Sequence, residues 1–359
     1  MQPVSTVQGA LSKPICGVAG LATWLPSGRQ TAAEIAAKTG LPEAVIAEKF
    51  GIVCKPTAGA DDHPCAMGAR AATLALDRAG VRPEEVDVVL SISEEYKEHP
   101  LMVSGIKLQQ LVGCRNAWAV DVAQRCCTTL AGLALARGLF AADPAIRTIL
   151  LAGGYRNGDL IDYGDSAVSF MWSLAAGGGA LVLRRGDDGR WPLRNALRGV
   201  ALRSDGDFAD DVHVPAGGTL RPLTVGDVGT AAAMLAVTDP AGMRARLAER
   251  SGRNFLGVID DSLAAAGAGR ADIGYLALLH MKRSAHHGTL ADLGVASERS
   301  TYLERYGHVG QFDPILSCEL AQAEGRLVDG DLVVMASAGV SYAWGAATLR
   351  WGPWAPQAS

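Results

Sequence analysis

The sequence predicts an α/β protein made of two similar halves that pack together. In the first half a helical pattern ends at Gly80, and an apolar strand pattern begins six positions later at Val86. In the second half a helical pattern ends at Gly267, and a strand pattern begins six positions later at Ile273. Strands that alternate with helices indicate parallel or mixed sheets with helices on their faces.

A second recurrence supports the same duplication. The apolar segments 145–154 and 331–339 lie late in their halves, and a strand rich in glycine and alanine follows each of them. We therefore divide the chain into an N-terminal half, 1–190, and a C-terminal half, 191–359, each with a βαβαβ-type order. Two such halves related by a pseudo-twofold axis bring equivalent helix starts together, which predicts a shared site at the centre of the molecule.

The N-terminal elements follow from local patterns. Residues 15–24 predict a buried strand, and the alanine-rich segment after Thr31 predicts a short helix with that threonine as its N-cap. Residues 67–79 are rich in alanine and leucine and predict a strong helix. The strand at 86–93 is followed by a helical stretch at 100–112.

The next segments are more apolar. Continuous apolar character predicts a buried strand at 117–123. Residues 127–140 are apolar nearly all round and predict a buried helix. Residues 186–230 are rich in Gly, Asp and Pro, and we interpret them as the bridge between the halves together with surface loops.

Composition excludes several classes of protein. The chain is 49% hydrophobic and 19% charged, which is typical of a globular protein, and its net charge of −4 gives no reason to expect nucleic acid. No apolar run is long enough to span a bilayer, so no membrane partner is expected. The apolar stretch at 15–25 is interpreted as the first strand and not as a signal peptide. Seven cysteines without zinc-motif spacing indicate reduced thiols in a cytoplasmic protein with no bound metal.

Cys126 is the candidate nucleophile. It lies where the predicted strand at 117–123 turns into the buried helix, and a helix N-terminus stabilises a thiolate. A thiolate is the nucleophile that covalent acyl transfer needs. Most cysteines are small packing residues, and we assign that role to the adjacent Cys127.

Two histidines and an aspartate are candidates to act with this cysteine. His280 ends a buried strand, which is where α/β folds place ligands. His308 lies in a glycine-flanked loop before the helix that matches the one after Cys126. Asp313 caps the following helix, orients a histidine, or acts as a base.

The turn at 337–345 is a candidate oxyanion site. Its small residues allow the backbone amides of Gly339, Val340 or Ser341 to face an oxyanion beside the amide of Cys126. A tight hairpin without a catalytic role has the same sequence signature.

Three other features have simpler interpretations. The glycine run at 177–183 lacks the Lys-Ser/Thr of a phosphate-binding loop, so nucleotide binding is not expected. His286 and His287 are placed on a helix surface without metal-binding partners. The charged segment 94–100 is expected to be solvated, although it follows the strand that matches the one before His280 and so lies near an entrance.

These motifs resemble the thiolase superfamily, and within it the ketoacyl-ACP synthase III-like condensing enzymes. DVAQRCC resembles the family's nucleophile motif and selects Cys126, LLHMKRS resembles the segment with the first catalytic histidine, His280, and RYGHVGQFD resembles the segment that normally holds asparagine where this chain has His308. SAGVSYAWG resembles the family's glycine-rich oxyanion turn. The resemblance covers nearly the whole chain and implies a thiolase-like fold with α-β-α-β-α layers.

The resemblance implies an acyltransferase that works through a cysteine thioester. The Cys-His-His set resembles that of elongating ketoacyl synthases, which favours decarboxylative Claisen condensation with a malonyl thioester in a specialised or fatty-acid-like pathway. An alternative is an acyltransferase that forms an ester or amide, with Asp313 assisting. A second alternative is a non-catalytic partner subunit of a heterodimeric condensing enzyme, and a third is a thioesterase-like hydrolase.

The resemblance also implies the substrates and partners. The acyl donor is expected to be acyl-CoA or an acyl carrier protein whose phosphopantetheine arm enters by a tunnel, with no tightly bound cofactor. The family's dimers imply a homodimer, with the strand at 117–123 as its edge. The family's Phe-Gly-Asp-Gly stretch has become LAAGG at 174–178, and this departure implies a non-standard acyl donor or acceptor.

Overall fold

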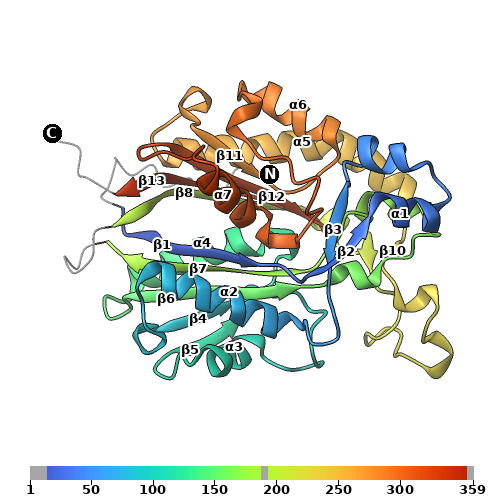
Figure 1. Ribbon diagram of the computed structural model, residues 1–359, viewed down its shortest axis with the longest axis horizontal. Coiled ribbons are helices and arrows are strands. Elements are labelled where there is room, and N and C mark those ends of the chain that lie inside the picture. Colours follow the sequence, from blue (N-terminus) through green and yellow to red (C-terminus); the bar gives the residue numbers. More distant parts are fainter. Residues whose placement is uncertain (1–13, 187–192, 354–359) are drawn as a thin grey trace.

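A nine-stranded mixed sheet forms the framework of the molecule (Figure 1). The computed structural model describes residues 14–186 and 193–353. Its strands occur in the order β11-β12-β13-β8-β1-β7-β6-β4-β5. Their bounds are β1 (Cys16–Trp24), β4 (Val88–Ser91), β5 (Trp118–Asp121), β6 (Thr148–Tyr155), β7 (Gly177–Arg185), β8 (Arg194–Ser204), β11 (Tyr275–Leu278), β12 (Leu332–Gly339) and β13 (Ala343–Pro353).

The other elements are helices and two short ribbons. The ribbons are β2 (Gly28–Thr31) with β3 (Cys54–Thr57), and β9 (Val212–His213) with β10 (Ala236–Val237). The helices are α1 (Ala32–Thr39), α2 (Pro64–Ala79), α3 (Ser104–Val112), α4 (Thr128–Ala142), α5 (Pro240–Ala265), α6 (Arg283–Leu293) and α7 (Asp313–Ala323).

The strand pairing repeats between the two ends of the sheet. In β4-β6-β7-β1 the first pair is parallel and the next two are antiparallel, and β11-β12-β13-β8 has the same pattern. The repeats meet where β1 pairs with β8 through Gly17 and Ala196. This correspondence supports the proposed division into halves, whose boundary at 190 lies outside the described residues.

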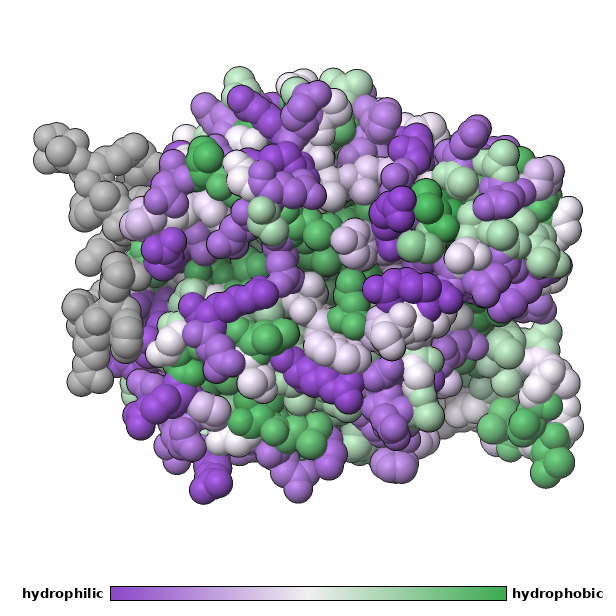
Figure 2. All heavy atoms as spheres, viewed as in Figure 1, coloured by the Kyte–Doolittle hydropathy of each residue, from purple (hydrophilic) through white to green (hydrophobic). Residues whose placement is uncertain are grey.

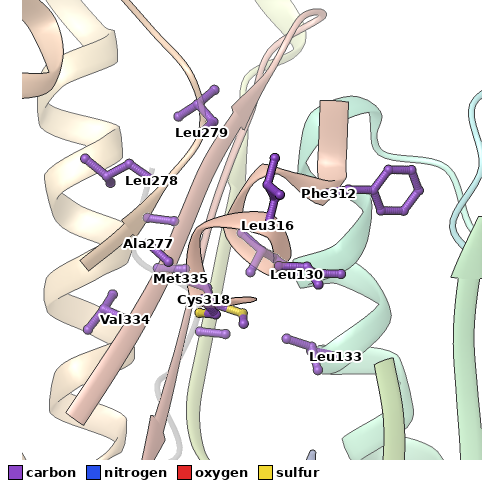
Figure 3. Packing of buried hydrophobic residues seen from close by; sticks show 14 of the residues in the cluster. Leu130, Leu133, Ala277, Leu278, Leu279, Phe312, Leu316, Cys318, Val334 and Met335 are labelled. Atoms are coloured by element: carbon purple, nitrogen blue, oxygen red, sulfur yellow. The ribbon is translucent and has the colours of Figure 1, made fainter. Parts of the chain in front are cut away.

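Helices separate and cover the two parts of the sheet, which gives the expected α-β-α-β-α layers. Helix α2 packs on β1, β6 and β7, and α5 packs on β8, β12 and β13 (Figure 1). Helices α4 and α7 lie between the repeats, because each contacts strands of both. Figure 3 shows Leu130 and Leu133 of α4 and Leu316 and Cys318 of α7 among the buried side chains of this layer.

Local sequence explains several of these elements. Thr31 caps α1 as expected, in a capping box with Glu34, and Gly40 ends this helix in the left-handed conformation. The glycine run of β7 is a packing requirement. A Cβ on Gly178 would lie 2.4 Å from the carbonyl oxygen of Met67 in α2, and one on Gly179 would lie 2.4 Å from the ring of Phe312.

Two sequence-based predictions about strands are wrong. The segment 186–230 is not only bridge and loops, since β8 lies within it and pairs along β13. Its Asp-, Gly- and Pro-rich flanks concealed the strand. The segment 117–123 is not buried, because β5 is the outer strand of the sheet and leaves Trp118 49% and Val120 39% exposed.

The prediction for one histidine is also wrong. His286 is buried, because the aromatic ring of Tyr302 covers it at 5.1 Å between ring centroids. Its neighbour His287 is exposed as expected. Within residues 14–186 and 193–353, no helix combines the length and apolarity needed to cross a bilayer.

The segment between β9 and β10 projects from the rest of the molecule. It forms the yellow lobe at the lower right of Figure 1, and apolar residues gather on its surface in Figure 2. Its exposed apolar side chains are Leu220, Leu223, Val225 and Val228.

Candidate active site

Cys126 lies in a single helical turn, Arg125–Cys127, that leads directly into α4. Arg125 has φ 50°, a left-handed conformation that is unusual for a residue with a side chain. This sharp turn places the cysteine at the start of the central helix, as the sequence predicts. Only 7% of Cys126 is exposed.

His308 contacts this cysteine directly. Its Nε2 lies 3.1 Å from Sγ of Cys126, and its Nδ1 lies 2.5 Å from Oδ2 of Asp313. Asp313 begins α7, the helix that corresponds to α4 in the second half. The structure thus brings together a thiol, an imidazole and a carboxylate that orients the imidazole, which is the geometry of a catalytic triad.

Asp313 holds more than the imidazole. Its Oδ1 accepts a hydrogen bond from the amide of Val309 at 2.7 Å, and its Oδ2 accepts one from the amide of His280 at 2.6 Å. Of the three roles that the sequence leaves open for Asp313, the geometry favours the orientation of a histidine.

Burial and nearby charges act on His308 in opposite directions. Burial disfavours its imidazolium form, but the charges of Asp313 and Cys126 and the hydrogen bonds to both raise the pKa of His308 well above 6.5. The ring is therefore a proton carrier that can hold a proton beside the sulfur.

His280 borders the same cavity, but its ring makes its hydrogen bond elsewhere. Its Nε2 donates to the carbonyl oxygen of Gly51 at 3.0 Å, and its ring stacks on Tyr302. Burial lowers the pKa of His280 to about 4, so the ring is neutral. Both predicted histidines thus border the cavity that contains Cys126, and His308 is the one whose ring hydrogen-bonds the cysteine.

The hairpin between β12 and β13 lies against the nucleophile. A Cβ on Gly339 would lie 2.9 Å from the backbone nitrogen of Cys126. The Cys127 thiol donates to the carbonyl oxygens of Ser337 and Ala343 at 3.3 Å each, and burial raises its pKa well above 9.0.

Gly339 and Val340 both border the cavity with Cys126, but Gly339 pairs with Ala343 in the β12–β13 ladder and Val340 lies beyond it. Ser341 has φ 76° in the turn and does not border the cavity. Val340 is thus the best placed of the three oxyanion candidates.

A cavity of about 1030 Å³ opens onto these residues. Most of its wall is apolar, which suits an acyl chain or another apolar group. The apolar wall includes Leu160, Phe170, Met171, Leu174, Val212, Leu235 and Tyr342. Among the described residues, no cluster of three or more His, Cys, Asp or Glu could hold a metal ion.

One buried carboxylate in this cavity was not singled out from the sequence. Glu94 was placed with a solvated loop, but it is only 4% exposed and borders the cavity with Cys126. Its Oε2 accepts a hydrogen bond from Arg125 at 3.1 Å, and Arg125 also pairs with the exposed Glu95. The sequence contains one signal for Glu94: this residue follows β4, just as His280 follows the equivalent strand β11.

Comparison with known families identifies the chain. The family described as 3-oxoacyl-[acyl-carrier-protein] synthase III matches residues 120–206, and its C-terminal part matches residues 263–351. The chain is a ketoacyl-ACP synthase III-like condensing enzyme. The predicted family, the thiolase-like α/β fold and the acyltransferase class are therefore confirmed.

Relatives of this condensing enzyme extend over nearly the whole chain. A beta-ketoacyl-[acyl-carrier-protein] synthase III of Rhizobium meliloti is 25% identical and covers 93% of this chain and 98% of its own. The solved 3-oxoacyl-(acyl carrier protein) synthase III of Pseudomonas aeruginosa has a TM-score of 0.80 at 23% identity and covers 95% of this chain and 100% of its own. The priming beta-ketosynthase of the R1128 polyketide pathway has a TM-score of 0.79 at 19% identity, and the match covers 97% of this chain and 100% of its own. These structures share the fold.

Proposed function

We propose that this condensing-enzyme relative transfers an acyl group through Cys126 to the oxygen or nitrogen of an acceptor. The observation that carries the proposal is the continuous contact from Cys126 through His308 to Asp313, with distances of 3.1 and 2.5 Å. A base that contacts the nucleophile and is oriented by a carboxylate moves protons efficiently in acyl transfer.

The first half of the reaction loads the enzyme. Sγ of Cys126 attacks the carbonyl carbon of an acyl thioester of CoA or of a carrier protein. The bond from this carbon to the donor sulfur breaks, and His308 gives a proton to the departing thiolate. The amides of Cys126 and Val340 are the candidate donors to the oxyanion of the tetrahedral intermediate.

The second half of the reaction transfers the acyl group from Cys126 to the acceptor. His308 takes the proton of an acceptor hydroxyl or amine, whose oxygen or nitrogen attacks the acyl carbon. The bond between this carbon and the sulfur of Cys126 breaks, and an ester or amide leaves. The proton remains on His308 beside the regenerated sulfur, and Asp313 stabilises the imidazolium.

Decarboxylative condensation is the second candidate, because the named relatives are beta-ketoacyl-ACP synthases. Stabilising a malonyl-derived enolate with two histidines needs N–H groups from both near the cysteine. Nε2 of His280 instead donates to Gly51, so this candidate requires the His280 ring to turn. The geometry therefore favours transfer to oxygen or nitrogen.

The deciding experiment starts with intact mass spectrometry after incubation with a panel of acyl-CoA and acyl-carrier-protein thioesters. We expect an added acyl mass on the wild type and none on Cys126→Ala. The acyl-enzyme is then given either malonyl thioester or an alcohol or amine. Ester or amide formation without CO2 supports the proposal, whereas CO2 release with a β-ketoacyl product supports condensation.

A further outcome addresses the remaining alternatives. Failure of every donor to acylate Cys126 would contradict both candidates and support a non-catalytic partner subunit. Acyl-enzyme that is lost only to water would support a hydrolase.

A further inference from the structure

Three residues that border the active-site cavity have a buried hydrogen-bond acceptor without a partner in the described part of the chain. They are Glu94 through Oε1, Asn157 through Oδ1 and His280 through Nδ1. Asn157 is partly exposed, and the two others are almost fully buried. Glu94 is 4% exposed and His280 is 5% exposed, and both border the cavity that contains Cys126 and His308. Buried polar atoms are nearly always paired, so unpaired ones on two almost fully buried side chains of one cavity indicate a ligand that pairs them.

The hydrogen bonds of His280 define what its free nitrogen can do. Nε2 carries the proton, because it donates to the carbonyl oxygen of Gly51. The ring is neutral, since burial lowers its pKa to about 4. Nδ1 is therefore an unprotonated hydrogen-bond acceptor, and its partner must be an O–H or N–H group.

Glu94 has the same need for a hydrogen-bond donor. Arg125 donates to its Oε2, and its Oε1 has no partner. Burial raises the pKa of Glu94, while the charges of Arg125 and His308 lower it. A ligand hydroxyl or amine that donates to Oε1 would compensate the carboxylate for its lost water.

Glu94 and His280 occupy equivalent places in the two repeats. Glu94 follows β4 and His280 follows β11, which are equivalent strands. Both residues border the cavity together with Cys126 and His308. A molecule in this cavity therefore lies among these residues, and an apolar wall surrounds the rest of it.

We propose that the acceptor substrate has an apolar body and at least two hydrogen-bond donors beside its reacting group, as in a ring or chain that carries a polyol or amino-alcohol unit. Glu94 and His280 each bind one of these donors. This inference rests on the proposed acyl transfer to oxygen or nitrogen, and it names the class of acceptor.

The test compares two alcohols of similar shape on preformed acyl-enzyme. The protein is acylated with an acyl-CoA, freed of CoA and mixed with cyclohexanol or with cis,cis-1,3,5-cyclohexanetriol. Ester formation and loss of acyl mass are followed by mass spectrometry. We expect the second-order rate constant for the triol to exceed that for cyclohexanol by about tenfold or more, beyond the statistical factor for its extra hydroxyls.

Variants identify the residues that bind the additional hydroxyl groups of the triol. Glu94→Gln and His280→Phe should each reduce the triol preference about tenfold. Glu95→Gln, which removes the exposed carboxylate on the same arginine, is the matched control and should change the preference less than twofold. Comparison of the two alcohols on the wild type decides the question even where a variant folds poorly.

The outcomes separate this inference from the proposed function. Ester formation at equal rates from both alcohols overturns the inference and leaves acyl transfer to oxygen standing. Failure of every CoA and carrier-protein donor to form acyl-enzyme, or acyl-enzyme that transfers its acyl group to no alcohol or amine, overturns the proposed function and the inference with it. A triol preference that survives both variants also overturns the inference.

Discussion

Asp313 connects three parts of the active site through its two oxygens. It orients the His308 ring and fixes the backbone of Val309 and His280, so its charge and its geometry both act on the base. Its neighbour in the site, Glu94, pairs instead with Arg125 next to the nucleophile. Each of the two buried carboxylates thus pairs with a residue next to Cys126: Asp313 with His308, and Glu94 with Arg125.

Replacing the carboxylate of Asp313 by an amide should impair the base. Asp313→Asn removes the charge that raises the pKa of His308, so deacylation should slow about 10²- to 10⁴-fold and its pH profile should shift to lower pH. Stopped-flow deacylation between pH 5 and 9 measures both effects.

The double variant is the control for this prediction. Because the two residues act as a unit, His308→Gln/Asp313→Asn should be no slower than the slower single variant. Additive losses, or a single Asp313→Asn variant with more than half of the wild-type rate, would contradict the triad. A thermal melt of each variant separates this effect from unfolding.

Among the elements, the β12–β13 hairpin sets the position of the nucleophile. Gly339→Ala would place a methyl group 2.9 Å from the nitrogen of Cys126 and 2.9 Å from Cβ of Arg125. We expect the rate of Cys126 acylation to fall about tenfold or more, because the backbone amide of Cys126, a candidate donor to the oxyanion, must move. Rapid-quench acylation followed by intact mass measures this rate.

A helical glycine supplies the matched control. Gly288 lies inside α6, and a Cβ there meets no atom within 4 Å. Gly288→Ala should leave the acylation rate unchanged and raise the free energy of unfolding by about 0.5–1 kcal/mol. An unchanged acylation rate in Gly339→Ala would show that the hairpin does not position the cysteine.

The same elements show what the sequence could and could not predict. The paired glycine-to-strand spacing and the two matching helix starts were enough to bring Cys126 and His308 together, because they depend on the order of elements. The rotation of the His280 ring toward Gly51 depends on a contact with a segment far away in the sequence. The sequence does not reveal β8, because turn-rich flanks dominate the composition around it. The sequence also cannot distinguish a buried β5 from an exposed one, because its apolar side chains suit an interface as well as a core.

For the whole molecule, buried histidines set the pH range of stability. Burial lowers the pKa values of His280 and His286 to about 4, whereas both would titrate near 6.5 in the unfolded chain. Between these values the unfolded chain binds more protons, so stability is lost as the pH falls from 6.5 to 4, by up to about 3 kcal/mol for each histidine. His308 acts in the opposite sense, since its raised pKa gives stability that is lost as the pH rises above 6.5. We expect maximal stability near pH 6.5.

Urea unfolding at pH values from 4.5 to 7.5 measures this profile. His286→Phe removes one of the buried histidines outside the Cys126–His308 contact and should flatten the acid limb by about half. An acid limb of unchanged slope in this variant would show that other groups cause the loss.

The outer strand of the sheet predicts how the molecule assembles. Among the residues that the structure describes, β5 pairs only with β4, and it carries the exposed Trp118 and Val120, with Ile106 exposed on the adjacent α3. An open apolar edge invites pairing with another chain, and a second copy can cover it symmetrically when two β5 strands pair about a twofold axis. We therefore expect a solution mass of twice the 37.3 kDa chain by light scattering at micromolar concentration.

Ile106→Glu/Val120→Lys should give a monomer, because charges at the edge oppose this pairing. Val225→Lys, which changes an equally apolar exposed residue on the projecting lobe, should remain a dimer. A monomeric wild type, or a double variant that stays dimeric, would rule out β5 as the interface.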